Sequence, residues 1–149
     1  MGTRHLLFGA GGLSLAVPAE LVKTIHEQLT VQAVAGTRDW FRGLGVAHGK
    51  LLPVTDMGAF FGRRSSTGHT LEIAASVGMS GLQVDTVYGL SNMPISEIPL
   101  NRQNTASHRG ENPALSSRAI VQDERVHRLL DVAALLQSPA FLNIAENSH

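Results

Sequence analysis

The chain has 149 residues, no cysteine, and 12 basic and 12 acidic side chains, which give a formal net charge of zero. A chain of this length buries roughly 68–70% of its unfolded surface, so it can form a core without disulfides or metal ions, and stapled mini-protein folds are excluded. Charged residues make up 16% of the sequence, against roughly 25% in a typical globular protein. This neutral composition argues against a nucleic-acid-binding face.

The first apolar run, residues 6–18, is shorter than the roughly 20 apolar residues of a membrane-spanning helix, so no membrane insertion is predicted. Because Arg4 precedes this run, one alternative is a secreted or periplasmic β-barrel binding domain whose signal peptide is cleaved after Ala19. Gly9, Gly11 and Gly12 interrupt the run and favour instead a hairpin of two short strands.

Short strand-like segments recur along the sequence, as they do in β-barrels and β-sandwiches. They cover residues 6–8, 13–17, 29–34, 51–55, 71–77, 82–87, 118–121 and 126–130. Further hairpins are expected around residues 78–81 and at Asp123-Glu124, where the turn type stays open because glycine is absent. The sequence therefore predicts an all-β fold with a few short helices.

Two segments repeat one pattern. Asp56 follows a strand and precedes Phe60-Phe61 by four residues, and Asp131 stands in the same relation to Leu135-Leu136. Each aspartate is expected to cap a short helix, which suggests two similar half-domains.

Other segments are less regular. Residues 20–27 fit either a short helix or a strand, and residues 139–145 are expected to form a terminal helix that begins at a proline. Residues 101–114 are polar and predict a long, partly disordered surface loop.

No local motif for catalysis or metal binding is present. The seven histidines are about twenty residues apart, and spacing leaves open only a site assembled from distant segments. The glycines of residues 9–12 precede a strand rather than a helix, which does not suit a phosphate loop, and Ser80 lacks the G-x-S-x-G context of a nucleophile. We therefore expect no enzyme, no cofactor and no metal ion; an enzyme assembled around Ser80, His48 or Asp85 is the third alternative.

The segment DWFRGLGVAHGKLLPVTDM, residues 39–57, is the most distinctive one. It joins two of the seven aromatic residues to three closely spaced glycines and a proline within a strand. The segment fits either a core aromatic pair beside a tight turn or an exposed strand edge offered to a protein partner.

The same segment resembles the CheW-like family of chemosensory adaptors, which typically reads F-I/L-x-G-V-x-N-L-R-G-x-I/L-x-P-V-x-D-L. GLQVDTVYGL and RLLDVAALL resemble later family segments, and the resemblance extends from about His5 to Leu136. It is strongest to the twitching-motility members that control type IV pili, the PilI/ChpC type.

The resemblance implies two SH3-like five-stranded β-barrel subdomains within one CheW-like domain, residues 1–149, with a hydrophobic seam between them. It implies a cytoplasmic, non-enzymatic adaptor that binds the regulatory domain of a CheA-type histidine kinase and the cytoplasmic tip of a chemoreceptor. No nucleic acid or membrane insertion is expected.

One departure from the family pattern concerns the motif N-x-R-G, which here reads Val46-Ala47-His48-Gly49. Arginine is always charged, whereas histidine is mostly neutral at pH 7, so the contacts of this motif are expected to be more apolar or to serve a different partner. The groove between the half-domains is expected to contribute to binding. The predicted partner-binding residues are Val22, Ile25, Gly43, Val46, His48 and Gly49.

Overall fold

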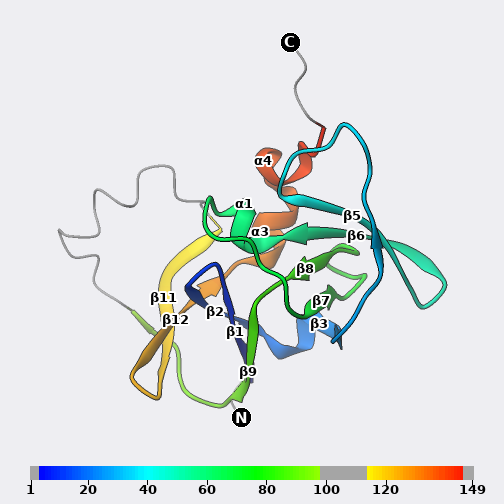
Figure 1. Ribbon diagram of the computed structural model, residues 1–149. Coiled ribbons are helices and arrows are strands. Elements are labelled where there is room, and N and C mark those ends of the chain that lie inside the picture. Colours follow the sequence, from blue (N-terminus) through cyan, green and yellow to red (C-terminus); the bar gives the residue numbers. More distant parts are fainter. Residues whose placement is uncertain (1–3, 98–113, 146–149) are drawn as a thin grey trace.

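The computed structural model describes residues 4–97 and 114–145, which form two six-stranded sheets with short helices between them (Figure 1). Sheet A has the strand order β10-β11-β12-β2-β1-β9, and sheet B has the order β3-β7-β8-β6-β5-β4. The strands of sheet A are β1 His5–Ala10, β2 Leu13–Pro18, β9 Thr86–Ser91, β10 Ser96–Glu97, β11 Leu115–Gln122 and β12 Arg125–Leu130. Those of sheet B are β3 Val22–His26, β4 Val31–Gln32, β5 Phe41–Ala47, β6 Lys50–Asp56, β7 Thr70–Ile73 and β8 Gly81–Gln83.

The two sheets share one arrangement, which confirms the expected pair of half-domains. Each contains one parallel contact, between β12 and β2 in sheet A and between β6 and β8 in sheet B, while the other neighbours are antiparallel. The half-domains are not consecutive in the chain. Sheet A combines the first two strands, β1 and β2, with the last four, β9 to β12, and sheet B is formed by the strands between them. The two-residue strands β4 and β10 extend each sheet beyond the five strands expected for an SH3-like subdomain.

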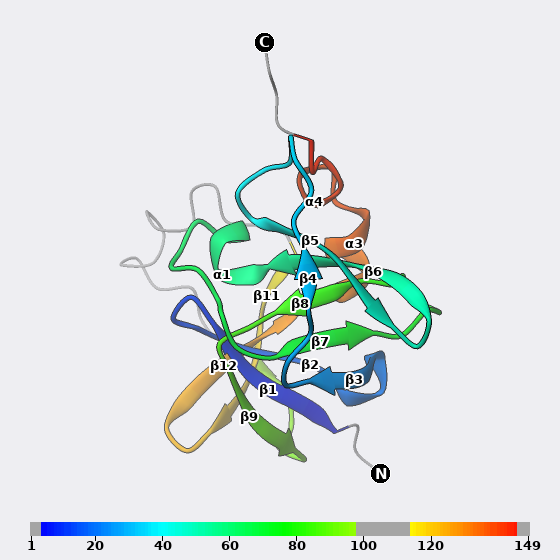
Figure 2. The same ribbon diagram turned by 45° about the vertical axis from the view of Figure 1, so that its right-hand side comes forward.

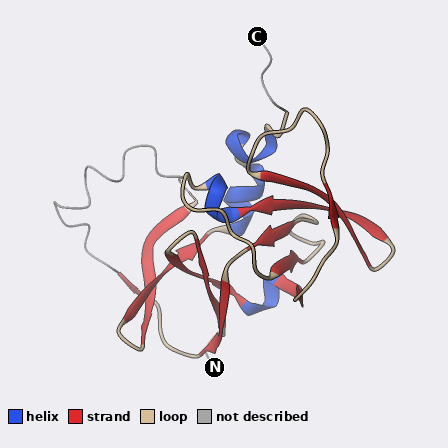
Figure 3. Ribbon diagram, viewed as in Figure 1, coloured by secondary structure: helices blue, strands red, loops and turns tan. Residues whose placement is uncertain are grey.

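Short helices follow corresponding strands of the two sheets, as the repeated aspartate pattern predicted (Figure 3). Helix α1, Met57–Phe60, follows β6, and α3, Val132–Gln137, follows β12. The carboxylates of Asp56 and Asp131 accept hydrogen bonds from the third residue of each helix, at 3.0 and 3.1 Å. The terminal helix α4 spans Pro139–Leu142, slightly shorter than expected.

The hairpin turns follow from local sequence. Gly11 and Gly12 have positive φ angles in the β1–β2 turn, so these glycines form a hairpin connection rather than a phosphate loop. Asp123 and Glu124 have φ angles of 54° and 63°, so the β11–β12 connection is a type I′ turn without glycine. The expected hairpin around residues 78–81 is present as β7 and β8.

Several predicted boundaries were wrong. Strand β5 was not predicted as a strand. Of the two alternatives for residues 20–27, the strand is confirmed, because β3 follows a 3₁₀ turn, Ala19–Leu21. The predicted strands 29–34 and 71–77 are shorter in the structure, where they correspond to β4 and β7. Strand β7 ends before Ala74 because the Ala74 carbonyl accepts a hydrogen bond from the Val77 N–H and so begins a turn.

The predicted strand 82–87 is divided between the two sheets. The N–H of Val84 donates to His69 next to sheet B, and the N–H of Asp85 donates to Gly9 of sheet A. The chain therefore passes from one sheet to the other at these two residues. Of the predicted loop 101–114, all but Ala114 lies outside the described residues, and Ala114 is buried.

The core lies mainly in the seam between the sheets. The largest cluster joins Leu6, Phe8 and Leu15 of sheet A to Leu71 and Leu82 of sheet B. The helices contribute Met57 of α1, Val132 and Leu135 of α3, and Phe141 of α4. Two smaller clusters are separate, one on β1, β2 and β11 and one on β5 and β6. Strand β1 is buried along its whole length because alternate side chains face the seam and the smaller cluster.

Residues 5–18 form the β1–β2 hairpin, whose two strands are adjacent interior strands of sheet A (Figure 2). None of the helices within residues 4–97 and 114–145 has the length and apolar character needed to span a bilayer.

Candidate partner-binding surface

The β5–β6 hairpin presents an apolar pair to solvent. His48 and Gly49 form its two-residue turn with φ angles of 54° and 74°, a type I′ geometry in which a histidine at the first position is uncommon. One step from the turn, Val46 pairs across the strands with Leu51, and their exposed fractions are 61% and 62%. Two large aliphatic side chains left side by side in water are a candidate contact for another protein.

Gly43, also on β5, is buried and serves the fold. Its φ angle is 132°, and a Cβ atom at this position would overlap the backbone carbonyl of Gln32 in β4. The absence of a side chain therefore allows β4 to lie against β5. The sequence prediction placed Gly43 at the partner interface, but the structure places it beneath the surface.

Strand β3 supplies the other predicted residues. Val22 is half-buried and Ile25 is exposed, and both line a groove that Leu6, Ala19 and Leu90 complete. The groove runs between the edge strand of sheet B and strands of sheet A. It is thus one part of the predicted groove between half-domains.

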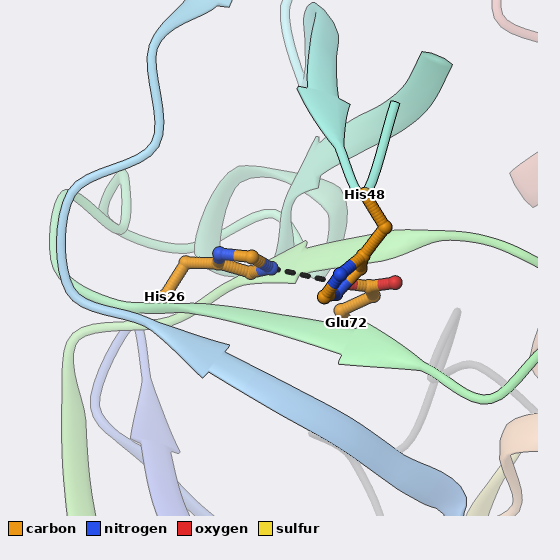
Figure 4. Close-up of side chains that lie close together, drawn as sticks. All are labelled: His26, His48 and Glu72. Atoms are coloured by element: carbon orange, nitrogen blue, oxygen red, sulfur yellow. Dashed lines mark hydrogen bonds and ion pairs between the residues drawn. The ribbon is translucent and has the colours of Figure 1, made fainter. Parts of the chain in front are cut away.

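The tip of the hairpin reaches the β3–β7 pair, although β5 and β3 are far apart in the order of sheet B. Nε2 of His48 lies 3.2 Å from Oε1 of Glu72 and 3.5 Å from Oγ1 of Thr24. Nε2 of His26 lies 2.8 Å from the same oxygen of Glu72 (Figure 4). The structure therefore brings His48 to the strand that carries Val22 and Ile25.

Sequence reasoning did not identify His26 or Glu72 as part of this surface. His26 and Glu72 are 46 positions apart, and His48 and Thr24 are 24 apart, so no local spacing reports the cluster. The alternation of polar and apolar residues in β7 was the one available signal, because Glu72 lies between the core residues Leu71 and Ile73.

A second groove includes residues of the β5–β6 hairpin. It is lined by Phe41 and Pro53 of the hairpin, Met79 of the β7–β8 connection, and Leu136 and Leu142 near the end of the described chain. This groove also joins the two halves of the molecule.

The aromatic pair at the start of the distinctive segment packs inward, with Phe41 in the core and Trp40 half-buried beside it. Phe41 is buried, and Trp40 packs edge-on against Phe60 at 5.0 Å and stacks on Phe141 at 6.2 Å between ring centroids. Of the two readings of this segment, the core reading therefore holds for Phe41, while the end of the hairpin that follows is exposed at Val46 and Leu51.

A second buried carboxylate, Asp56 at the end of β6, is used for structure. Asp56 caps α1, accepts hydrogen bonds from the Ser66 N–H at 2.8 Å and the Ser65 hydroxyl, and pairs with Arg42 at 3.2 Å. The same guanidinium donates to Gln83. With its oxygens occupied in this way, Asp56 has no free position for acid–base chemistry.

Comparisons with known proteins agree with this geometry. A family model described as the CheW-like domain matches residues 4–140. Protein PilI from Pseudomonas aeruginosa is 29% identical over 143 residues, which cover 93% of this chain and 78% of PilI. The crystal structure of the scaffolding protein TtCheW from Thermoanaerobacter tengcongensis has the same fold, with a TM-score of 0.76 at 15% identity over 99% of this chain and 100% of that one.

Proposed function

The chain belongs to the family of CheW-like domains, and from this premise we propose that it is a cytoplasmic signalling adaptor that couples chemoreceptors to a CheA-type histidine kinase. The similarity to PilI supports a place in a chemosensory system that controls type IV pili. The CheW family consists of non-enzymatic scaffold proteins, and the proposed activity is binding alone. We also propose that the chain acts as one domain of two subdomains, because its largest core cluster is shared by both sheets.

The observation that carries this proposal is the exposed Val46–Leu51 pair at the end of the hairpin. Binding is favoured when a partner removes such an apolar pair from water. Backbone groups at the end of the hairpin can also form hydrogen bonds that align the partner. We name this region the hairpin surface. It consists of Val22, Ile25, Val46, His48, Gly49 and Leu51, while Gly43 lets β4 pair with β5 of the same hairpin.

The expected affinity is that of a transient signalling contact. Full burial of a valine or leucine side chain contributes about 1.5–3 kcal/mol, and about three fifths of each side chain remains to be buried here. The pair can therefore contribute roughly 2–3 kcal/mol, which corresponds to about 30–150-fold in Kd. Several adaptors in one assembly would raise the effective affinity through multivalency.

The proposal is tested by measuring binding of the chain to the purified regulatory domain of a CheA-type kinase from the same organism. The variant V46S/L51S is expected to weaken binding by about 30-fold or more. Binding to the cytoplasmic tip of a receptor from that organism is measured in the same way.

The fold offers a matched control. Val121 and Val126 form the corresponding cross-strand pair of the β11–β12 hairpin, one step from its type I′ turn, and are also exposed. The variant V121S/V126S should leave kinase binding within about threefold of the unaltered chain, since surface changes away from a contact have small effects. No detectable binding of the unaltered chain at high micromolar concentration would reject the adaptor role, and loss of binding only in V121S/V126S would reject the hairpin surface.

A further inference from the structure

Three segments distant in sequence bring two imidazoles and a carboxylate together beneath the hairpin tip. His26 comes from β3, Glu72 from β7, and His48 from the β5–β6 turn, and Figure 4 shows both rings directed toward the carboxylate. Each histidine places Nε2 within 3.2 Å of the same oxygen, Oε1 of Glu72. The candidate ligand atoms of the three residues all lie within 4.8 Å of one another.

The arrangement follows from strand register. Thr24 of β3 stands opposite Glu72 of β7, so His26, two residues further along β3, lies on the same face as Glu72. His48 comes from above, where the left-handed conformation of the turn directs it toward this face. Two positions are therefore fixed by one strand pair, and the third depends on where the hairpin tip lies.

The carboxylate is almost completely withdrawn from water. The side chain of Glu72 is 4% exposed, and its ion-pair partners within residues 4–97 and 114–145 are these two histidines. A buried carboxylate needs hydrogen bonds and a positive charge that balances its own. A bound cation would supply that balance.

The donor set specifies the class of cation. Imidazole nitrogen combined with a carboxylate oxygen suits Zn²⁺ and its neighbours among the transition metals, whereas Mg²⁺ and Ca²⁺ prefer oxygen donors alone. Three protein ligands leave one position open in a tetrahedral zinc site. The side chain of His48 is 48% exposed, so an ion can enter from solvent on that side.

Metal binding requires the three side chains to adjust. Zinc bonds of about 2.0–2.2 Å place the ligand atoms of a tetrahedral site about 3.3–3.5 Å apart. The two nitrogen–oxygen distances are 2.8 and 3.2 Å, so they would widen by about 0.1–0.7 Å, and the two ligand nitrogens, which lie within 4.8 Å of each other, would adopt the same separation. The exposed His48 side chain can supply this movement.

We propose that His26, His48 and Glu72 form a binding site for a divalent transition-metal ion of the Zn²⁺ class, which fastens the tip of the β5–β6 hairpin to the β3–β7 strand pair. Bound metal would then hold Val46 and Leu51 in a fixed position relative to β3. The site does not rest on the adaptor role, because its test uses the chain alone.

The direct test is a titration of chelator-treated protein without a polyhistidine tag. Calorimetry with Zn²⁺ is expected to show one ion per chain with a Kd in the micromolar range or tighter, and Co²⁺ is expected to give the visible absorption of a tetrahedral site. At about 100 times Kd, Zn²⁺ should raise Tm by roughly 5–10 °C. Mg²⁺ should produce neither effect.

Variants distinguish this site from other histidines of the chain. H48A and E72Q should each weaken Zn²⁺ binding by about 100-fold or more, because each removes a ligand. H69Q removes an imidazole outside the cluster and should leave binding unchanged. H48R should also abolish binding, since arginine cannot coordinate the ion and its permanent charge can pair with Glu72.

His48 lies in an exposed turn, so its replacement is not expected to unfold the chain. Circular dichroism of H48A and H48R checks that both variants keep the fold. Hydrogen exchange at the tip of the hairpin should slow when Zn²⁺ is added to the unaltered chain. Failure of the unaltered chain to bind Zn²⁺ at about 100 µM free metal would overturn the site. Binding that H48A and E72Q do not change would place the ion elsewhere and overturn it as well.

Discussion

Replacement of Asp56 by alanine is expected to lower the free energy of unfolding by about 3–5 kcal/mol, several times the cost of the same replacement at Asp131. Both aspartates cap a short helix with nearly the same geometry, at 3.0 and 3.1 Å from the helix N–H. A cap of this kind contributes about 1 kcal/mol, which is the whole effect expected at the exposed Asp131.

The difference comes from the surroundings of Asp56. Its side chain is almost fully buried and also accepts hydrogen bonds from the Ser66 N–H and the Ser65 hydroxyl. Hydrogen bonds to a charged group contribute about 1.5–3 kcal/mol each, and a buried donor left without its partner loses that amount. The ion pair with Arg42 contributes less to this loss of stability, because the Arg42 side chain is 37% exposed and water can solvate its guanidinium in the variant.

The assay is urea unfolding of D56A, D131A and the unaltered chain, followed by far-ultraviolet circular dichroism and by fluorescence of Trp40, the single tryptophan. The transition midpoints should shift while the m-value stays constant, and the two probes should coincide. Equal destabilisation of D56A and D131A, within about 0.5 kcal/mol, would refute the reasoning, because it would mean that the buried network adds nothing to the cap.

Three further outcomes follow from the structure. G43A should destabilise the chain by more than G49A, because both glycines have positive φ angles but only a Cβ atom at position 43 would overlap the backbone of β4. The urea midpoints of the two variants measure this difference, and equal midpoints would contradict the close contact. Burial, and then the charge of Arg125, lower the pKa of His127, so the folded state resists its protonation; unfolding free energy should fall as pH drops through about 6.5, and H127Q should flatten that slope, whereas an unchanged slope would assign it to other groups. F8A, in the centre of the seam, should cost about 3–5 kcal/mol by calorimetry, and a loss below 1 kcal/mol would show that the seam does not hold the sheets together.

The sequence by itself determined the features that depend on neighbours along the chain. Alternating short apolar segments predicted most of the strands, the glycines at residues 9–12 predicted a hairpin turn, and the repeated aspartates predicted the two caps. The motif around residues 41–56 indicated the family, which the family model matches over residues 4–140. These signals work because turns, caps and strand alternation are interactions of nearby residues.

The tertiary structure alone decided which distant segments meet. Strand β5 escaped prediction because its three inward glycine and alanine positions give a weak apolar alternation, and only the β4 contact explains the requirement for Gly43. Sequence also could not reveal that one strand-like run passes between two sheets, or that His26, His48 and Glu72 share a site. The physical reason is that register between strands and the position of a hairpin tip depend on packing across the whole core, and spacing along the chain does not encode either of them.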